Sequence, residues 1–212
     1  MNAPFRICFV CTGNICRSPM AESVFRAHLA EDGLDGLVEV DSAGTGGWHE
    51  GDGADPRTVA VLRAGGYAHA HTARQFRASW FDRLDLVIAL DSGHLRALRS
   101  LAPTEQDAAK VRLLRSYAKG AAGAAADAGP RELPGLISDS SDSDLTGDLD
   151  VPDPYYGGFA GFEECLEMIE TASEDLLAAV RTALTSRAVV AAGAPGHDAP
   201  RDPHRSRAKE RA

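Results

Sequence analysis

The feature that most constrains the fold is an apolar run that ends in a glycine-containing loop and leads straight into a helix start. Residues 5–10, Phe-Arg-Ile-Cys-Phe-Val, are apolar on both faces apart from Arg6. This pattern is typical of a strand buried in a parallel sheet. Ser18 and Pro19 follow as a helix cap and a proline at the first helical position. Residues 11–18 are therefore predicted to form a loop between a buried strand and a helix.

The rest of the chain alternates between strand and helix patterns. Short apolar runs predict three more strands, at residues 38–41, 84–90 and 111–114. Helical patterns are found at residues 18–31, at 56–64, through His94 and Leu98, and at 162–186. This alternation predicts the α/β class, as a single doubly wound domain with a four-stranded parallel sheet flanked by helices.

Two segments fall outside this alternation. Residues 119–148 are rich in Ala, Gly, Ser and Asp, and residues 188–212 are rich in Pro, Gly, His and Arg. Neither composition buries enough apolar surface to order the chain. We therefore predict one domain over residues 1–187, with a disordered insert at 119–148 and a disordered basic tail at 188–212.

Composition and charge exclude several classes of protein. The formal net charge is −9, and the sequence lacks the basic face of a nucleic-acid binder. No stretch approaches the roughly 20 apolar residues of a membrane span, and the N-terminus lacks the pattern of a secretory signal. Three of the four cysteines crowd into residues 8–16, which is no disulfide framework. These observations predict a cytoplasmic protein that binds neither nucleic acid nor membrane.

The loop at residues 11–18 carries the chemistry. A helix N-terminus offers unpaired amides and a positive dipole end, which together bind oxyanions. The residues between Cys11 and Arg17 let the backbone curl around a tetrahedral dianion, and the guanidinium can close the ring with a bidentate contact. The positive surroundings also favour the nucleophilic thiolate of Cys11. Either residue alone is weak evidence, but the two together on a strand–loop–helix predict catalysis.

Phosphate-ester cleavage also needs an acid that protonates the leaving oxygen. Asp153 lies between Pro152 and Pro154, and two prolines hold an aspartate on a stiff loop. Tyr155 and Tyr156 follow directly, in a position to flank an aromatic ring. By itself this segment is equally consistent with a simple turn.

Taken together, these residues resemble the low-molecular-weight protein tyrosine phosphatases, and the bacterial members closely. The resemblance covers most of residues 5–118 and 149–186, and its most specific elements are the loop at 11–18 and the Asp-Pro-Tyr-Tyr element at 153–156. It implies a phosphotyrosine-protein phosphatase that works through a phosphocysteine intermediate. It also implies tyrosine-phosphorylated proteins as partners, with a bacterial tyrosine kinase as a candidate among them, and a monomeric enzyme.

The resemblance implies a role for each matching residue. Cys11 would be the nucleophile, Arg17 would hold the phosphoryl oxygens, and Asp153 would act first as acid and then as base. Ser18 would donate to the thiolate and Asn14 would lock the backbone of the loop. The other implied positions are His71 and Asp91 as supports, Thr12, Gly13, Ile15 and Cys16 in the phosphate loop, and Ile15, Trp48, Tyr155 and Tyr156 around the substrate ring.

One departure from the family concerns the residues after Asp91. The family often has Asn there, whereas this chain has Ser92-Gly93-His94. The hydrogen bonding at this point is therefore left open.

Three rival functions use the same residues differently. An arsenate reductase of this fold needs two further cysteines, but only Cys8 and Cys165 are available outside the loop. A protein-arginine phosphatase tends to carry Thr where this chain has Ile15. A module that only binds phosphotyrosine would not need both Cys11 and Asp153.

Two further expectations concern cofactors and oxidation. No residues cluster in the way that metal ligands do, so neither a metal nor another cofactor is expected. Cys16 lies five residues after Cys11 on one tight loop, so we expect it to protect Cys11 under oxidation.

Overall fold

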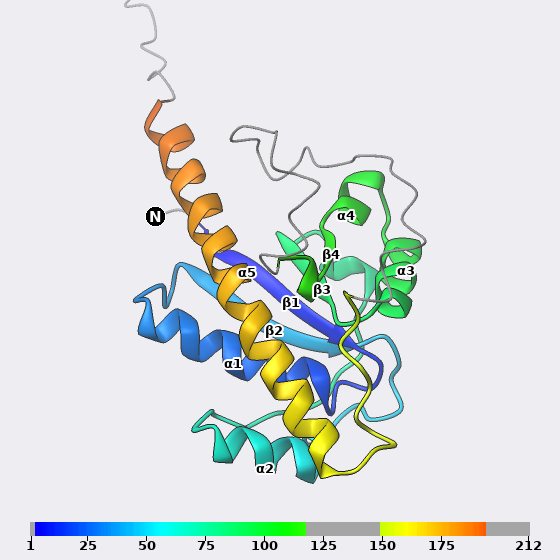
Figure 1. Cartoon of the computed structure of the whole chain (residues 1–212). Coiled ribbons are helices and arrows are strands. Elements are labelled where there is room, and N and C mark those ends of the chain that lie inside the picture. Colours follow the sequence, from blue (N-terminus) through cyan, green and yellow to red (C-terminus); the bar gives the residue numbers. More distant parts are fainter. Residues whose placement is uncertain (1–2, 118–148, 194–212) are drawn as a thin grey trace, which may run out of the picture.

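Four parallel strands form the centre of the computed structural model, which describes residues 3–117 and 149–193 (Figure 1). Their order in the sheet is β2-β1-β3-β4. The strands are β1 (Phe5–Cys11), β2 (Val38–Gly44), β3 (Leu86–Ala89) and β4 (Val111–Leu113). The predicted α/β fold class with a four-stranded parallel sheet is confirmed.

Helices connect these strands and cover both faces of the sheet. They are α1 (Arg17–Glu31), α2 (Pro56–Ala64), η1 (Ala78–Trp80), α3 (Ser92–Leu101), α4 (Glu105–Ala109), η2 (Leu114–Tyr117) and α5 (Phe159–Gly193). The bounds predicted for α2 are confirmed, because Asp55 caps its start and Gly65 ends it. Helix α4 was not predicted. It has five residues, too few to show a hydrophobic period, and Thr104 caps it.

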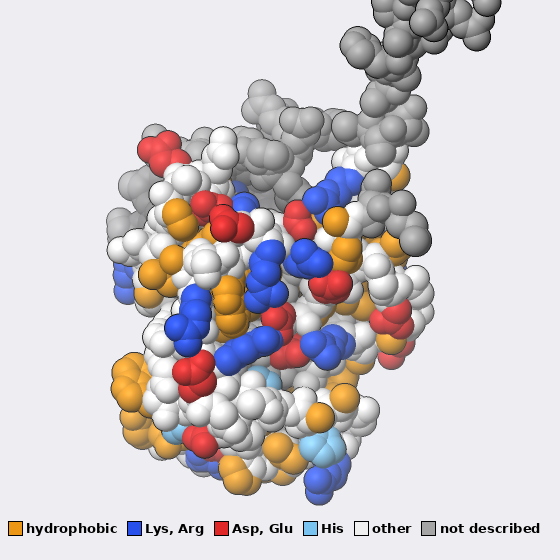
Figure 2. All heavy atoms as spheres, turned by 180° about the vertical axis from the view of Figure 1, so that it is seen from behind, with side chains coloured by type: hydrophobic (Ala, Val, Ile, Leu, Met, Phe, Trp, Pro, Cys, Tyr) orange, Lys and Arg blue, Asp and Glu red, His pale blue; other side chains and the backbone are white. Residues whose placement is uncertain are grey.

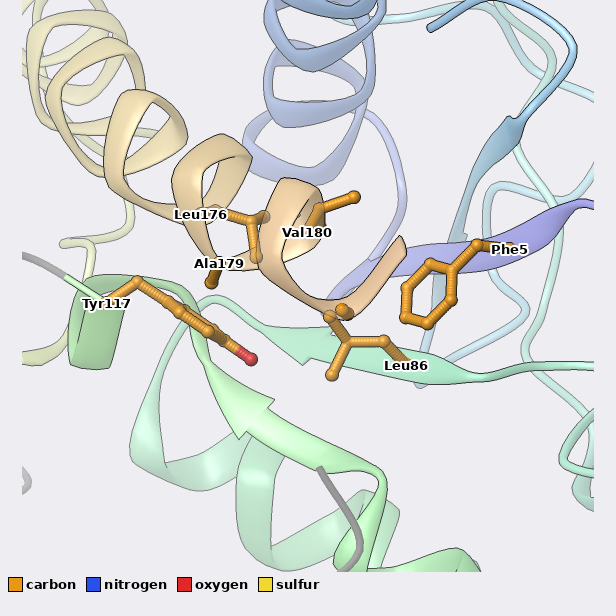
Figure 3. A pocket seen from close by; sticks show the side chains of 7 residues that line it. Phe5, Leu86, Tyr117, Leu176, Ala179 and Val180 are labelled. Atoms are coloured by element: carbon orange, nitrogen blue, oxygen red, sulfur yellow. The ribbon is translucent and has the colours of Figure 1, made fainter. Parts of the chain in front are cut away.

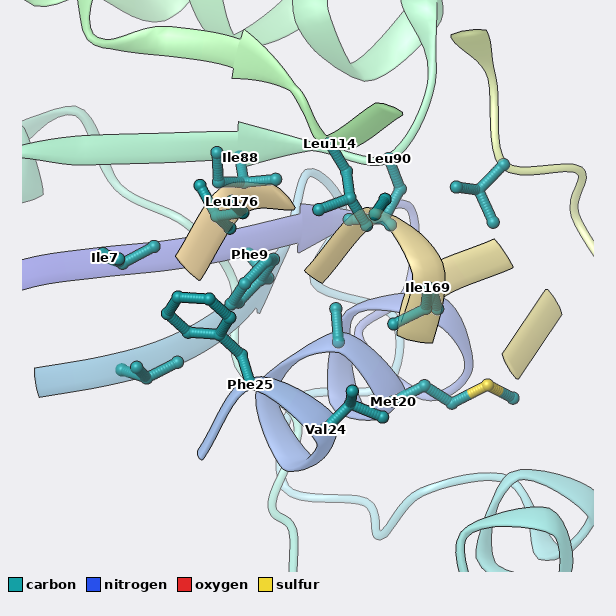
Figure 4. Close-up of a cluster of buried hydrophobic side chains, with 14 of the residues drawn as sticks. Ile7, Phe9, Met20, Val24, Phe25, Ile88, Leu90, Leu114, Ile169 and Leu176 are labelled. Atoms are coloured by element: carbon teal, nitrogen blue, oxygen red, sulfur yellow. The ribbon is translucent and has the colours of Figure 1, made fainter. Parts of the chain in front are cut away.

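Alternating side chains of β1 point into two separate cores. Ile7 and Phe9 face α1 and α5, where they pack with Phe25 (Figure 4). Cys8 and Val10 face the opposite side, where they pack with residues of α3 and with Phe81 beside η1. Because both faces are covered, β1 is buried along nearly its whole length, as its apolar run predicts.

Helix α5 is longer than predicted at both ends. It begins at Phe159 and continues to Gly193, so residues 188–193 are helical and the prediction of disorder from residue 188 is wrong there. Residues 188–192 are Ala and Val, with no helix breaker before Gly193. The remainder of the tail and the insert predicted at 119–148 lie outside the described residues.

Arg187 fastens α5 at the edge of the sheet where the strands begin. Its guanidinium contacts Asp85 at 2.8 Å and lies 5.2 Å from the centroid of the Phe5 ring. A small apolar pocket lies at this edge, between α5, Phe5, Leu86 and Tyr117 (Figure 3). It is at the opposite end of β1 from Cys11, so it is not part of the site described below.

The face of the sheet away from α5 carries charges of both signs (Figure 2). Arg6 pairs with Glu39 at 2.7 Å, and Arg74 and Arg83 both pair with Asp41. Cations and carboxylates are thus interleaved over this surface.

Among the described helices, none is long and apolar enough to cross a membrane.

The parallel arrangement brings the ends of three strands together. β1 ends at Cys11 opposite Gly44, the last residue of β2, and β3 ends at Ala89 beside Val10. The loops that follow these strands therefore meet at one edge of the sheet, which is where open parallel sheets bind ligands.

Candidate active site

The loop at residues 11–18 has one backbone position that only a few residue types tolerate. Asn14 has a φ of 57°, and among the described residues it is the one non-glycine with positive φ. Its Nδ2 donates to Ser18 Oγ and to Ser42 Oγ, both at 2.9 Å, and its Oδ1 accepts from the backbone N–H of Arg74 at 2.9 Å. These three hydrogen bonds hold the loop in its left-handed turn.

His71 lies behind the same turn. Its Nε2 is 2.7 Å from the carbonyl oxygen of Asn14, and its Nδ1 is 3.9 Å from Glu22 Oε2. Glu22 in turn accepts from the Ser42 hydroxyl. His71 therefore reaches Asn14 directly, and Ser18 is reached through the Asn14 side chain.

Ser18 lies beside the sulfur of Cys11 and does not cap the helix as predicted. Helix α1 begins two residues earlier than that cap implies, at Arg17, with Cys16 at the cap position and without a side-chain cap bond. Ser18 Oγ lies 3.0 Å from Cys11 Sγ and 3.2 Å from the carbonyl oxygen of Ala43. The hydroxyl is therefore used at the sulfur, and the cap prediction failed because the Ser-Pro pair sits inside the first turn.

Arg17 is buried, with 3% of its surface exposed, and its guanidinium contacts two carboxylates. Nη1 donates to Asp91 Oδ2 at 2.7 Å and to the carbonyl oxygen of Val151 at 3.0 Å. Nη2 donates to Asp153 Oδ2 at 2.8 Å and lies 3.4 Å from Thr12 Oγ1. Burial alone would lower the pKa of Arg17, but Cys11, Asp153 and Asp91 outweigh burial and raise it.

Asp153 is held near Arg17 by a loop anchored to the end of β3. The backbone N–H of buried Val151 donates to the carbonyl oxygen of Leu90 at 2.8 Å. Asp153 Oδ1 accepts from the backbone N–H of Tyr155 at 3.1 Å, and its side chain is 41% exposed. The carboxyl thus has one oxygen on Arg17 and remains open to solvent.

Aromatic side chains form an exposed rim around the loop. Trp48 is 78% exposed and lies over Gly46, whose backbone N–H donates to the carbonyl oxygen of Thr12 at 2.9 Å. Tyr155 and Tyr156 meet edge to face at 5.0 Å, and Tyr156 is 93% exposed. Trp48 thus lies beside the loop and the two tyrosines follow Asp153, and Trp48 and Tyr156 are mostly exposed.

Ile15 and the tyrosines are connected through the start of α2. The carbonyl oxygen of Ile15 accepts from the backbone N–H of Asp55 at 2.8 Å. Asp55 holds Arg57 in an ion pair at 2.9 Å, and the Arg57 guanidinium lies 5.7 Å from the Tyr155 ring centroid. Ile15 and Tyr155, two of the residues predicted for the substrate pocket, are thus linked through Asp55 and Arg57.

Comparison with known proteins identifies the family. Residues 6–130 and 136–186 match the sequence model of the low molecular weight phosphotyrosine protein phosphatases. The chain belongs to this family. It is 65% identical over 184 residues to a low molecular weight protein-tyrosine-phosphatase of Streptomyces coelicolor, which covers 87% of this chain and 98% of the relative. It is therefore a protein-tyrosine-phosphatase, a phosphoric monoester hydrolase.

Solved structures share this fold. The crystal structure of YfkJ from Bacillus subtilis has 36% sequence identity and a TM-score of 0.66, covering 85% of this chain and 96% of YfkJ. The YwlE arginine phosphatase, solved as a mutant with a phosphorylated active-site serine in place of a cysteine, has 26% identity and a TM-score of 0.63. That match covers 84% of this chain and 96% of YwlE.

The remaining cysteines of this phosphatase are buried thiols. Burial, aided by the charge of Asp55, raises the pKa of Cys16 to about 12. Burial likewise raises the pKa of Cys8 and of Cys165 to about 12. All four cysteines are free. Across the described residues, no group of three or more His, Cys, Asp or Glu could hold a metal ion.

Sequence reasoning missed several residues that the structure places at the phosphatase loop. Ser42 and the backbone of Arg74 hold Asn14, and the carbonyl of Val151 holds Arg17. His94 contacts both Thr12 and Asp91. For His94 a signal existed, because an Asp three residues before it, at the start of a helix, is a typical N-cap arrangement.

Proposed function

We propose that this phosphatase hydrolyses phosphotyrosine in proteins through a phosphocysteine intermediate on Cys11. The observation that carries the proposal is the cluster in which Cys11 Sγ meets Ser18 Oγ at 3.0 Å and Arg17 meets Asp153 at 2.8 Å. A nucleophile, a cation for the phosphoryl oxygens and a carboxyl group thus lie around one loop.

In the first step, the Cys11 thiolate attacks phosphorus and an S–P bond forms while the bond to the tyrosyl oxygen breaks. Asp153, in its protonated form, gives its proton to that leaving oxygen. The guanidinium of Arg17 and the loop amides stabilise the charge on the three remaining phosphoryl oxygens. The hydroxyl of Ser18 supports the sulfur as it accepts and later releases the phosphoryl group.

In the second step, water attacks phosphorus and the S–P bond breaks. Asp153, now a carboxylate, accepts a proton from that water, and inorganic phosphate and the Cys11 thiolate result. The phosphorylated serine of the YwlE mutant supports a covalent step, because there the residue that replaces the cysteine carries phosphate.

The rim favours an aromatic phosphoester. Ile15 supplies a branched apolar side chain within the loop, and Trp48, Tyr155 and Tyr156 supply three aromatic rings with exposed surface. A phenyl ring gains contact area and edge-to-face geometry from such a surface. Tyrosine-phosphorylated proteins are therefore the partners that we propose.

A protein-arginine phosphatase is the second candidate, because the YwlE arginine phosphatase shares the fold at 26% identity. Ile15 argues against it, since a flat ring suits a branched apolar side chain better than a guanidinium does. An arsenate reductase is disfavoured because Cys8 and Cys165 are buried thiols whose pKa is raised to about 12.

The experiment compares hydrolysis of phosphotyrosine and phosphoarginine peptides by the full chain and by Cys11→Ser. We expect turnover of phosphotyrosine only, and its loss in Cys11→Ser. The matched control is Cys165→Ala, a buried cysteine of α5, which should retain turnover. Preference for phosphoarginine, or appreciable turnover by Cys11→Ser, would contradict the proposal.

A further inference from the structure

His94 occupies a position inside the site that the proposed mechanism does not explain. It lies in the first turn of α3 and is only 5% exposed. Nε2 lies 2.8 Å from Thr12 Oγ1, and Nδ1 lies 2.9 Å from Asp91 Oδ1, an ion-pair distance without the geometry of a hydrogen bond. Both ring nitrogens therefore face residues that contact Arg17.

These contacts close a ring of four side chains. Thr12 contacts His94, His94 contacts Asp91, Asp91 contacts Arg17 at 2.7 Å, and Arg17 Nη2 returns to Thr12 Oγ1 at 3.4 Å. The ring joins the loop after β1, the first turn of α1 and the start of α3. A displacement of any one member therefore moves the guanidinium that is to hold the phosphoryl group.

The hydrogen atoms can be placed consistently around this ring. A carboxylate only accepts, so the nitrogen that faces Asp91 is the donor, which leaves Nε2 of a neutral imidazole as an acceptor. Nε2 then accepts from the Thr12 hydroxyl, whose lone pairs are free to face Arg17. Three of the four contacts are hydrogen bonds, and the close approach of Nδ1 to Asp91 Oδ1 completes the ring.

A purely structural role accounts for only part of this arrangement. The cap of α3 is made by Asp91 Oδ1, which accepts from the backbone N–H of His94 at 2.7 Å. Any residue except proline at this position supplies that backbone donor. The imidazole is therefore not needed to start the helix, and its contact with Thr12 serves the loop.

We propose that His94 is a positioning residue, which fixes the Thr12 hydroxyl and the Asp91 carboxylate so that Arg17 points at the phosphoryl oxygens. This inference rests on the proposed function of Arg17 as the phosphate-binding cation. It assigns to the loop a support from α3 in addition to the support from His71 and Ser42 on the other side.

The test measures inhibition by inorganic phosphate, kcat/KM for an aryl phosphate and the melting temperature. In His94→Ala we expect the inhibition constant of phosphate to rise and kcat/KM to fall by about 10- to 100-fold, by analogy with the loss of a side chain that orients a metal ligand. Thr12→Val, which keeps the shape and removes the hydroxyl, should act in the same direction. Thr12→Ser, which keeps the hydroxyl, should retain most of the activity.

A double-mutant cycle decides whether the two residues act together. If they form one ring, His94→Ala combined with Thr12→Val should be little worse than the worse single variant. The matched control is His28→Ala, in the last turn of α1 and about 16 Å along the helix from Arg17, which should change neither constant. Fully additive losses, or a lower melting temperature with unchanged phosphate inhibition, would overturn the proposal.

Two further measurements keep the outcome decisive. If His94→Ala does not fold, the cycle is run with His94→Asn, whose shorter amide still offers a donor and an acceptor. Titration of inorganic phosphate into Cys11→Ser, with and without His94→Ala, reports binding without hydrolysis. Weaker binding in the double variant supports the role of His94 even if the covalent mechanism fails, and equal binding refutes it.

Discussion

The phosphate loop and the rim of aromatic rings are built in opposite ways. In the phosphate loop, Asn14, Arg17 and Ser18 are buried polar residues, each with several hydrogen bonds. On the rim, Trp48 and Tyr156 are mostly exposed apolar rings with few neighbours. The loop thus buries polar side chains and the rim exposes apolar ones. Both are the reverse of the usual distribution.

The two regions differ in the free energy that it costs to bury their side chains. A buried guanidinium loses several kcal/mol of hydration unless carboxylates and carbonyls replace the water. Arg17 has such replacements in Asp91, Asp153 and the carbonyl of Val151. Loss of one residue of this cluster leaves its partners buried without a hydrogen bond. Loss of one ring from the rim exposes little buried surface. Variants in the two regions should therefore differ sharply in size of effect.

The largest expected effect comes from the centre of the loop. Arg17→Ala should abolish measurable hydrolysis of an aryl phosphate, because the phosphoryl oxygens lose their cation. It should also lower the melting temperature, since Asp91 then lies partly buried without its counter-charge. Arg57→Ala, an arginine on the rim side, serves as the comparison and should stay active. Equal losses in the two variants would remove the distinction between loop and rim.

Asp153 lies at the boundary between the two regions. Its substitution should lower the rate of catalysis without lowering the stability of the fold. Asp153→Asn should lower kcat by about 100- to 10,000-fold, as loss of a general acid usually does. The loss should shrink for a substrate whose leaving group needs no proton. Because the Asp153 side chain is 41% exposed, the melting temperature should hardly change. A loss that is independent of the leaving group would rule out the role as acid.

The rim should contribute to binding rather than to turnover. Removing one exposed ring, by Trp48→Ala or Tyr156→Ala, costs about 0.5–1.5 kcal/mol of aromatic contact. That corresponds to a rise in KM for a phosphotyrosine peptide of roughly two- to tenfold. The value of kcat should stay within about threefold. Steady-state kinetics on the two variants test this, and a collapse of kcat would place the rim within the catalytic machinery.

The last expected effect is on stability at high pH rather than on activity, and it concerns the buried thiol of Cys8. Burial raises the pKa of Cys8 to about 12, so the folded protein keeps this thiol protonated where the unfolded chain ionises it, above about pH 8.5. The stabilisation is complete below that pH and is lost as the pH rises toward 12. In Cys8→Ala, the fall in unfolding free energy between pH 8.5 and 10.5 should be shallower, by up to about 1.4 kcal/mol per pH unit. Urea unfolding across this range measures the slope, and unchanged slopes would show that Cys8 does not contribute.

Much of the fold was predictable because its signals are local. The apolar run of β1 and the Pro-to-Gly bounds of α2 lie within single segments, and the structure keeps both. The prediction that Ser18 caps α1 was wrong, because a Ser-Pro pair has the same local pattern whether it caps a helix or lies in its first turn. The predicted end of α5 was too early. The Pro and Gly residues after residue 193 were taken to indicate disorder for the preceding Ala and Val residues as well.

The site was predictable only in part, since its geometry depends on contacts across the sheet. Family resemblance pointed to Asn14 and Asp91, and the structure shows which atoms they meet. It did not point to Val151, whose contribution to Arg17 is a backbone carbonyl and leaves no trace in residue type. His94 was noticed as a departure, but its partners Thr12 and Asp91 are known only once α3 is placed beside the loop.

The sequence separations within the Arg17 cluster have a consequence for folding. Asp91, Val151 and Asp153 lie 74, 134 and 136 residues from Arg17 along the chain. A growing polypeptide therefore presents its nucleophile first and its acid last, and contacts of such long range form only after the entropy of loop closure has been overcome. Recovery of hydrolysis after dilution from denaturant should accordingly lag behind the return of helical circular dichroism. Aryl phosphate turnover would thus serve as a probe of the last contacts to form.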